Sequence, residues 1–133
     1  MRKTIDNNIT RISTSANLIT LVNVFTVEPE NQERLTKLLQ TATEQAIEHL
    51  PGFISANIHK SLDGTRVVNY AQWKTNEDFE AMLRNPEASK HMQEAFKIAQ
   101  VDPHLYKIES IHKAKISRNP SYRQKAYAQI QRR

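Results

Sequence analysis

Polar and apolar residues alternate through the stretch Thr65–Thr75, TRVVNYAQWKT. In a β-strand successive side chains point to opposite faces, so one face carries Val67, Asn69, Ala71 and Trp73. A buried amide costs about 1–3 kcal/mol unless its hydrogen bonds are satisfied. We therefore expect Asn69 either to have a structural partner or to face a ligand.

A second strand is predicted at Leu18–Val27, LITLVNVFTV, because this run is apolar at almost every position. Such runs are typical of strands that are covered on both faces. The odd-numbered positions share one face, and these are Ile19, Leu21, Asn23, Phe25 and Val27. Asn23 is therefore a second amide among large apolar neighbours.

The segment after this strand has apolar residues spaced three and four apart, which predicts an amphipathic helix over about Pro29–His49. Pro51-Gly52 ends it. A second helix begins after Thr75, an N-cap residue with Asp78 three positions later. Asn85-Pro86 interrupts this helix, and its apolar spacing then continues to Ile98.

Two further strands complete the pattern. Phe53–Lys60 is a short strand with Ile54, Ala56 and Ile58 on one face, and Asp63-Gly64 joins it to the strand at Thr65–Thr75 as a hairpin. The last strand is expected at about His104–His112, after the break at Asp102-Pro103.

The order strand, helix, strand, strand, helix, strand predicts an α+β fold of the ferredoxin-like type. Its four-stranded antiparallel sheet carries the helices on one face. The other face is also apolar, at Leu18, Val22 and Val24. A second copy of the sheet is the simplest cover for it, so we expect a homodimer.

Composition narrows the functional classes. The chain of 133 residues suits one domain, and its 2 glycines exclude phosphate-binding and dinucleotide-binding loops. Without cysteine there is no thiolate nucleophile and no zinc–thiolate site. No apolar run reaches membrane-spanning length, and the N-terminus lacks the apolar core of a signal peptide, so we expect a cytoplasmic protein that does not bind membranes.

The net charge of +5 belongs to the C-terminal tail, because all 14 acidic residues precede Lys113. We interpret the tail as a solvated extension, which makes nucleic acid an unlikely partner. The expected organisation is a flexible N-terminal arm over residues 1–17, one domain over residues 18–112 and a basic tail over residues 113–133.

Three segments carry a resemblance to a known family, namely LVNV at residues 21–24, VVNYAQWK at residues 67–74 and EDFEAMLRNPEA at residues 77–88. They resemble the antibiotic biosynthesis monooxygenase family, the dimeric α+β barrels. The resemblance extends over about Leu18–His112. It implies the ferredoxin-like fold and a homodimer.

The cofactor-free oxygenases of aromatic polyketide pathways are the most similar branch. The resemblance implies that Asn23, Asn69 and Trp73 are catalytic. It implies a small electron-rich aromatic substrate (an anthrone, phenol or quinol), dioxygen as the second substrate, and no metal or other cofactor. We expect four further residues to contact the substrate: Phe25, Phe79, Met82 and His91. No tyrosine or arginine of the chain matches a pocket acid–base group, so the proton acceptor is unassigned.

Two alternatives stay open. A second branch of the family degrades haem, with an asparagine on the first strand and a tryptophan and a histidine on the second helix. Asn23 and His91 roughly match that pattern, but about Met82 stands where the tryptophan would be. The other alternative is a protein without enzymatic activity that binds a small ligand or a partner.

Overall fold

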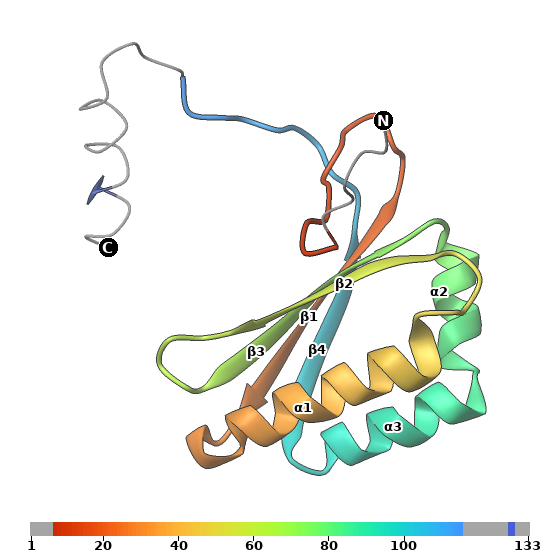
Figure 1. Ribbon diagram of the computed structural model, residues 1–133, viewed down its shortest axis with the longest axis vertical. Helices are drawn as coiled ribbons and strands as arrows, with labels where there is room; N and C mark the ends of the chain where they lie inside the picture. The colour runs from red at the N-terminus through yellow and green to blue at the C-terminus, as the bar shows by residue number, and fades with distance from the viewer. Residues whose placement is uncertain (1–6, 116–127, 130–133) are drawn as a thin grey trace.

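The computed structural model describes residues 7–115 and 128–129. It contains a four-stranded antiparallel sheet in the order β2-β3-β1-β4, with the helices on one face (Figure 1). The strands are β1 (Ile19–Val27), β2 (Phe53–Lys60), β3 (Arg66–Trp73) and β4 (Ala99–Tyr106), and the helices are α1 (Gln32–Ala42), α2 (Asn76–Leu83) and α3 (Pro86–Phe96). This confirms the ferredoxin-like α+β fold.

The register between β1 and β3 determines what lies against the helices. Leu21 pairs with Ala71 and belongs to one buried apolar cluster, together with Trp73, Phe79 and Met82. Phe25 pairs with Val67 and belongs to a second cluster with Val27, Leu35 and Leu39. Between these two pairs, Asn23 lies opposite Asn69. The two amides therefore separate the two halves of the hydrophobic core.

The helix predicted over Pro29–His49 is present, in three geometries. A short 3₁₀ turn, η1 (Pro29–Asn31), leads into α1, and a π-helical turn, η2 (Thr43–Ile47), follows it. The Thr43 hydroxyl donates to the Leu39 carbonyl at 2.7 Å. Wide turns of this kind are frequent at functional sites, and this one faces the sheet.

The predicted start and break of the second helix are confirmed. The Thr75 hydroxyl accepts from the Asp78 N–H at 3.0 Å and donates to the Asp78 carboxylate at 2.8 Å. The Asn85 side chain accepts from the N–H groups of Glu87 and Ala88, which caps α3 after the break. The chain therefore changes direction at Asn85-Pro86.

The predicted position of the last strand was wrong. The strand is β4, over Ala99–Tyr106, and residues 107–115 form no strand. Proline has no N–H for the hydrogen-bond ladder, so Asp102-Pro103 would interrupt a central strand. However, β4 is an edge strand, and proline is tolerated there.

The predicted faces of β2 were also wrong in part. A bulge between Phe53 and Ser55 shifts the alternation. Phe53 consequently packs against the core with Ala56, whereas Ile54 is 48% exposed. A bulge reverses the parity of every residue before it, and the apolar pattern alone does not reveal where it lies.

The N-terminal segment contacts the face of the sheet that the helices leave open. Thr10 donates a hydrogen bond to the Asn57 side chain at 2.7 Å, and the Gln72 amide donates to the Arg11 carbonyl at 2.8 Å. Leu18, Val22 and Val24 are half-buried beside them. None of the described helices is long and apolar enough to cross a membrane. The basic tail predicted from residue 113 falls largely outside the described residues.

Candidate functional site

Two adjoining cavities lie between the sheet and the helices. The inner cavity has a volume of about 40 Å³ and is lined by residues of β1, β2, β3, α1 and η2, with one methionine each from α2 and α3. The outer pocket has a volume of about 270 Å³ and opens between β1, β4, α2 and α3. Four residues line both: Leu21, Asn23, Met82 and Met92. The two spaces therefore share one wall.

The amides of Asn23 and Asn69 are the notable polar groups of this site. Asn23 is 6% exposed, and the Oδ1 atoms of both residues are buried without a hydrogen-bond partner. Leaving such an acceptor unsatisfied costs about 1–3 kcal/mol, and natural structures seldom contain one without a reason. Two of them, opposite each other on neighbouring strands, indicate a place where a ligand completes the hydrogen bonding.

Trp73 forms a rigid wall of the inner cavity. It is 1% exposed, and its ring makes edge-to-face contacts with Phe53 and Phe79, with centroid separations of 5.4 Å and 6.1 Å. Packed aromatic pairs of this kind hold a ring in one orientation. Phe79 in turn lines the outer pocket, so three aromatic rings connect the two spaces.

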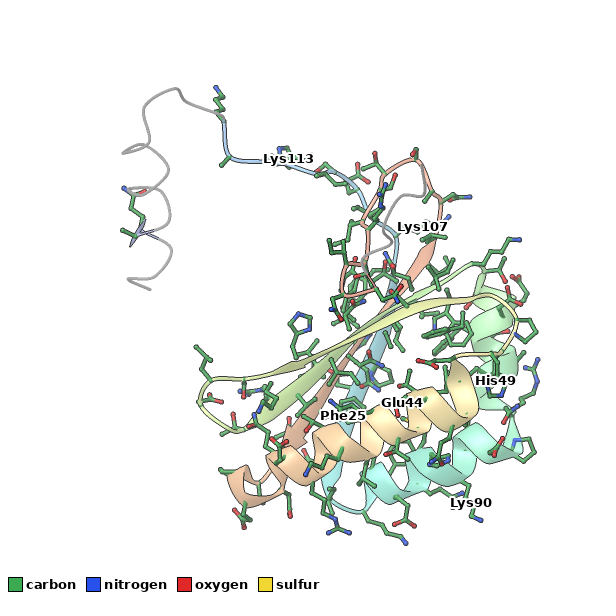
Figure 2. The ribbon with its side chains drawn as sticks, in the orientation of Figure 1. Phe25, Glu44, His49, Lys90, Lys107 and Lys113 are labelled. Atoms are coloured by element: carbon green, nitrogen blue, oxygen red, sulfur yellow. The ribbon has the colours of Figure 1, made fainter. Side chains whose placement is uncertain are left out.

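The structure brings together six of the seven residues predicted from the sequence. Those that line one or both cavities are Asn23, Asn69, Trp73, Phe25, Phe79 and Met82. Figure 2 shows Phe25 between the sheet and α1, where it closes the inner end of the site.

His91 is the exception. It lies in a shallow groove between α1 and α3, beside Arg34, Lys37 and Thr41, and lines neither cavity. Successive helical residues point about 100° apart, so the next residue, Met92, faces the cavities instead. His91 therefore lies outside the space that the other six predicted residues line.

Other lining residues were not predicted as site residues. Met92 and Phe96 belong to the apolar spacing of α3, and Ser89 is a polar residue of the same helix that the apolar pattern does not single out. Thr43 lines the inner cavity from the π-helical turn, which has no clear sequence signature. Pro103 was missed because β4 was expected to begin after it, and Leu105 was expected in the last strand but not at the site.

The described lining of the inner cavity contains no ionisable side chain, and that of the outer pocket contains only His104. The His104 ring lies 2.8 Å from an Asp102 carboxylate oxygen, with which it shares a strand face by parity. Amide dipoles act more strongly in such apolar surroundings than in water. Within the described residues, no group of three or more His, Cys, Asp or Glu could hold a metal ion.

Comparison with known proteins places this geometry in context. Residues 18–95 match the family described as antibiotic biosynthesis monooxygenase. The tetracenomycin-F1 monooxygenase of Streptomyces glaucescens is 47% identical over 92 residues, which cover 69% of this chain and 82% of that protein. The matched range, residues 18–95, spans Asn23, Asn69 and Trp73.

Solved structures share the fold. The ActVA-Orf6 monooxygenase of Streptomyces coelicolor, solved with nanaomycin D, superposes with a TM-score of 0.67 at 24% identity, covering 75% of this chain and 95% of that one. The cofactor-independent oxygenase SnoaB of Streptomyces nogalater gives a TM-score of 0.61 at 22% identity, covering 71% of this chain and 96% of that one.

Proposed function

Because the chain belongs to the antibiotic biosynthesis monooxygenase family, we propose that it is a cofactor-independent monooxygenase that oxidises an electron-rich polyketide-type aromatic with dioxygen. The enzyme class follows from the family and from the tetracenomycin-F1 monooxygenase. The substrate is an anthrone, phenol or quinol, and tetracenomycin F1 is the first compound to test.

The chemistry needs a substrate that can itself reduce dioxygen. An anthrone-type ring loses a proton from its methylene carbon, and the resulting anion passes electrons to dioxygen. One oxygen atom becomes the new carbonyl, and the other leaves as water with the two methylene hydrogens. The substrate supplies all the electrons, so the protein has to stabilise the developing negative charge, hold the ring and exclude water.

The residues of the site suit these three tasks. Asn23 and Asn69 can each present an amide N–H to an oxyanion, and Trp73 forms a rigid wall of the inner cavity beside them. Phe79 and Met82 supply the apolar walls that orient the ring and keep water out. His91 has no role in this proposal, because it lies outside both cavities.

The observation that carries the proposal is the pair of amides at the wall of an apolar pocket, whose Oδ1 atoms lack a donor. A phenol or quinol hydroxyl would donate to such an oxygen, and the N–H side of the same amide would donate to the oxyanion left after deprotonation. The test is oxygen uptake by the purified protein with tetracenomycin F1 and with a simple anthrone. With ¹⁸O₂ we expect one labelled atom in the quinone and one in water. Tight binding of both aromatics without oxygen uptake would instead support a binding protein.

The haem alternative has its own test. It depended on His91 as the iron ligand, and that side chain lies between α1 and α3 beside Arg34 and Lys37. We expect an absorbance scan after addition of haemin to show no histidine-ligated spectrum. A ligated spectrum that disappears in His91→Ala would overturn the monooxygenase proposal in favour of haem binding.

We further propose a homodimer formed through the open face of the sheet. Val22, Val24, Val68 and Tyr70 share that face and are half-buried without a helix above them. A second sheet supplies the cover that they lack. We also keep the division into an arm over residues 1–17, a domain over residues 18–112 and a tail from residue 113.

A further inference from the structure

We propose that the inner cavity is the binding site for dioxygen, separate from the outer pocket that takes the aromatic ring. This inference rests on the proposed function and deepens it, because it assigns the two substrates to two spaces. Nothing in the fold requires this division, since one continuous pocket would serve a monooxygenase equally well.

The size of the inner cavity argues for a diatomic ligand. A volume of about 10–15 Å³ holds one water molecule, and a cavity of about 150 Å³ holds a benzene ring. The inner cavity, at about 40 Å³, lies between these limits. It can accept dioxygen but cannot accept any ring of the aromatic substrate, which the outer pocket of about 270 Å³ can.

The lining also suits dioxygen. It is apolar apart from the side chains of Asn23, Asn69 and Thr43 and the indole N–H of Trp73. The Thr43 hydroxyl already donates to the Leu39 carbonyl at 2.7 Å, so the two amides and the indole N–H remain as the groups that can respond to a ligand. An apolar molecule enters such a space readily, and an amide N–H stabilises the negative charge that it acquires on reduction.

The position of the inner cavity places dioxygen beside the ring. Leu21 and Asn23 form the shared wall from the sheet, and Met82 and Met92 form it from the helices. Methionine side chains are unbranched and adaptable, so they can open a path between the two spaces. The substrate anion passes one electron to dioxygen at this opening, and the superoxide then couples with the ring-carbon radical through it, which forms the C–O bond of a peroxide that loses water to give the carbonyl.

The two amides consequently have different tasks. Asn23 lines both spaces, so it can stabilise the oxyanion of the substrate and the reduced oxygen. Asn69 lines only the inner cavity and acts on the reduced oxygen.

A binding experiment tests the site without any turnover. The alanine methyl groups of the protein are labelled with ¹³C, and their relaxation is measured under nitrogen and under dissolved oxygen. Ala42, Ala56 and Ala71 line the inner cavity, whereas Ala95 is 1% exposed in the other core cluster and serves as the buried control. We expect paramagnetic relaxation at Ala42 and Ala56 to exceed that at Ala95 severalfold.

A pair of matched variants gives the kinetic test. Ala71→Val fills the inner cavity from β3, where a β-branched residue is well accommodated. Ala88→Val makes the same change in the outer pocket. We expect Ala71→Val to raise the KM for dioxygen roughly tenfold with the KM for the aromatic unchanged, and Ala88→Val to raise only the KM for the aromatic.

The outcomes separate the two proposals. Equal relaxation at Ala42, Ala56 and Ala95 would overturn the dioxygen site. This is the result expected if the amide oxygens hold an ordered water molecule in the inner cavity. Strong relaxation at Ala42 in a protein that oxidises no aromatic would support the dioxygen site while the proposed function fails. If Ala71→Val does not fold, Ala56→Val fills the same cavity from β2.

Discussion

Asn23 on β1 lies directly opposite Asn69 on β3, and both carry a buried amide oxygen without a hydrogen-bond partner. The pairs on either side, Leu21 with Ala71 and Phe25 with Val67, are entirely apolar. A sheet selected only for stability would continue the apolar pattern through this position, because each unsatisfied acceptor weakens the fold. The pair is therefore best explained by what it does for a ligand.

The first prediction concerns Asn69→Ala. No partner is left unsatisfied by the substitution, so we expect the free energy of unfolding to stay the same or to rise. Turnover should fall by roughly 10²–10³ if the amide stabilises developing charge. Melting temperature and oxygen uptake are measured on the same preparation.

Asn57→Ala is the matched control for that experiment. The Asn57 amide donates to the Ser55 hydroxyl at 3.1 Å and to the Tyr70 carbonyl at 2.8 Å, on the open face of the sheet. Its loss should lower stability by about 1 kcal/mol without a direct effect on the chemical step. A destabilised Asn69→Ala with normal turnover would refute the catalytic role.

The second prediction tests the homodimer. Val24 and Val68 are paired neighbours on the open face of the sheet. We expect Val68→Lys to shift the protein toward monomer, because a desolvated charge at an interface is unfavourable. Light scattering over a concentration series measures the change. Leu62→Lys, at a fully exposed position in the β2–β3 turn, should leave the mass unchanged. A wild-type monomer at all concentrations would contradict the dimer.

Sequence reasoning succeeded where one local rule decides the outcome. Strand parity placed Asn69 and Trp73 on one face, and the capping residues fixed where α2 begins. It failed where the position or the buried face of a strand depends on the elements beside it. Pro103 is tolerated only because β4 lies at the edge of the sheet, and the bulge that exposes Ile54 depends on how β2 pairs with β3.

The site residues also divide into those that a local pattern reveals and those that depend on neighbouring elements. The two amides were identified because they are polar residues in apolar strands. His91 was predicted to contact the substrate but lines neither cavity, because helix phase has to be known to within one residue and Met92 takes the position facing the cavities. The two-part shape of the site depends on side chains from β1, β3, α1 and α3 together, which no pattern along the chain reveals.

The third prediction concerns the two ends of the chain. Deleting residues 1–12 removes Thr10 and the Arg11 carbonyl, which leaves the amide of Gln72 without its acceptor. Gln72 is 4% exposed, so we expect a loss of about 1–3 kcal/mol, or a fall of several degrees in melting temperature. Deleting the residues after Lys115 should change the melting temperature little. The reverse result would show that the tail, and not the arm, docks on the domain.

The fourth prediction compares two glycines with nearly the same backbone conformation. Gly52 has φ +79° and Gly64 has φ +81°, so alanine is strained at both by about 1–2 kcal/mol. A Cβ atom at Gly52 would also collide with the Asp78 side chain, which Thr75 holds in the cap of α2. At Gly64 the nearest atom is 3.6 Å away, on Pro29. We therefore expect Gly52→Ala to destabilise the protein clearly more than Gly64→Ala, as measured by urea denaturation.

The fifth prediction is a pH dependence at the β2–β3 turn. The Thr65 hydroxyl, the Thr65 backbone N–H and the Ser61 hydroxyl donate to the Asp63 carboxylate at 2.7, 3.0 and 2.8 Å. These bonds lower the pKa of Asp63 from 3.8 to about 2. A carboxylate whose pKa is lower in the folded state stabilises the fold fully above its unfolded pKa of about 4, and this stabilisation disappears as the pH falls through the folded value.

The stability difference between wild type and Asp63→Ala should therefore be constant near neutral pH and shrink below about pH 4. Denaturation curves of both proteins over this range provide the measurement, and oxygen uptake near neutral pH should be the same for both, because the turn lies outside both cavities. A difference that does not change with pH would show that Asp63 acts through its shape and not through its charge.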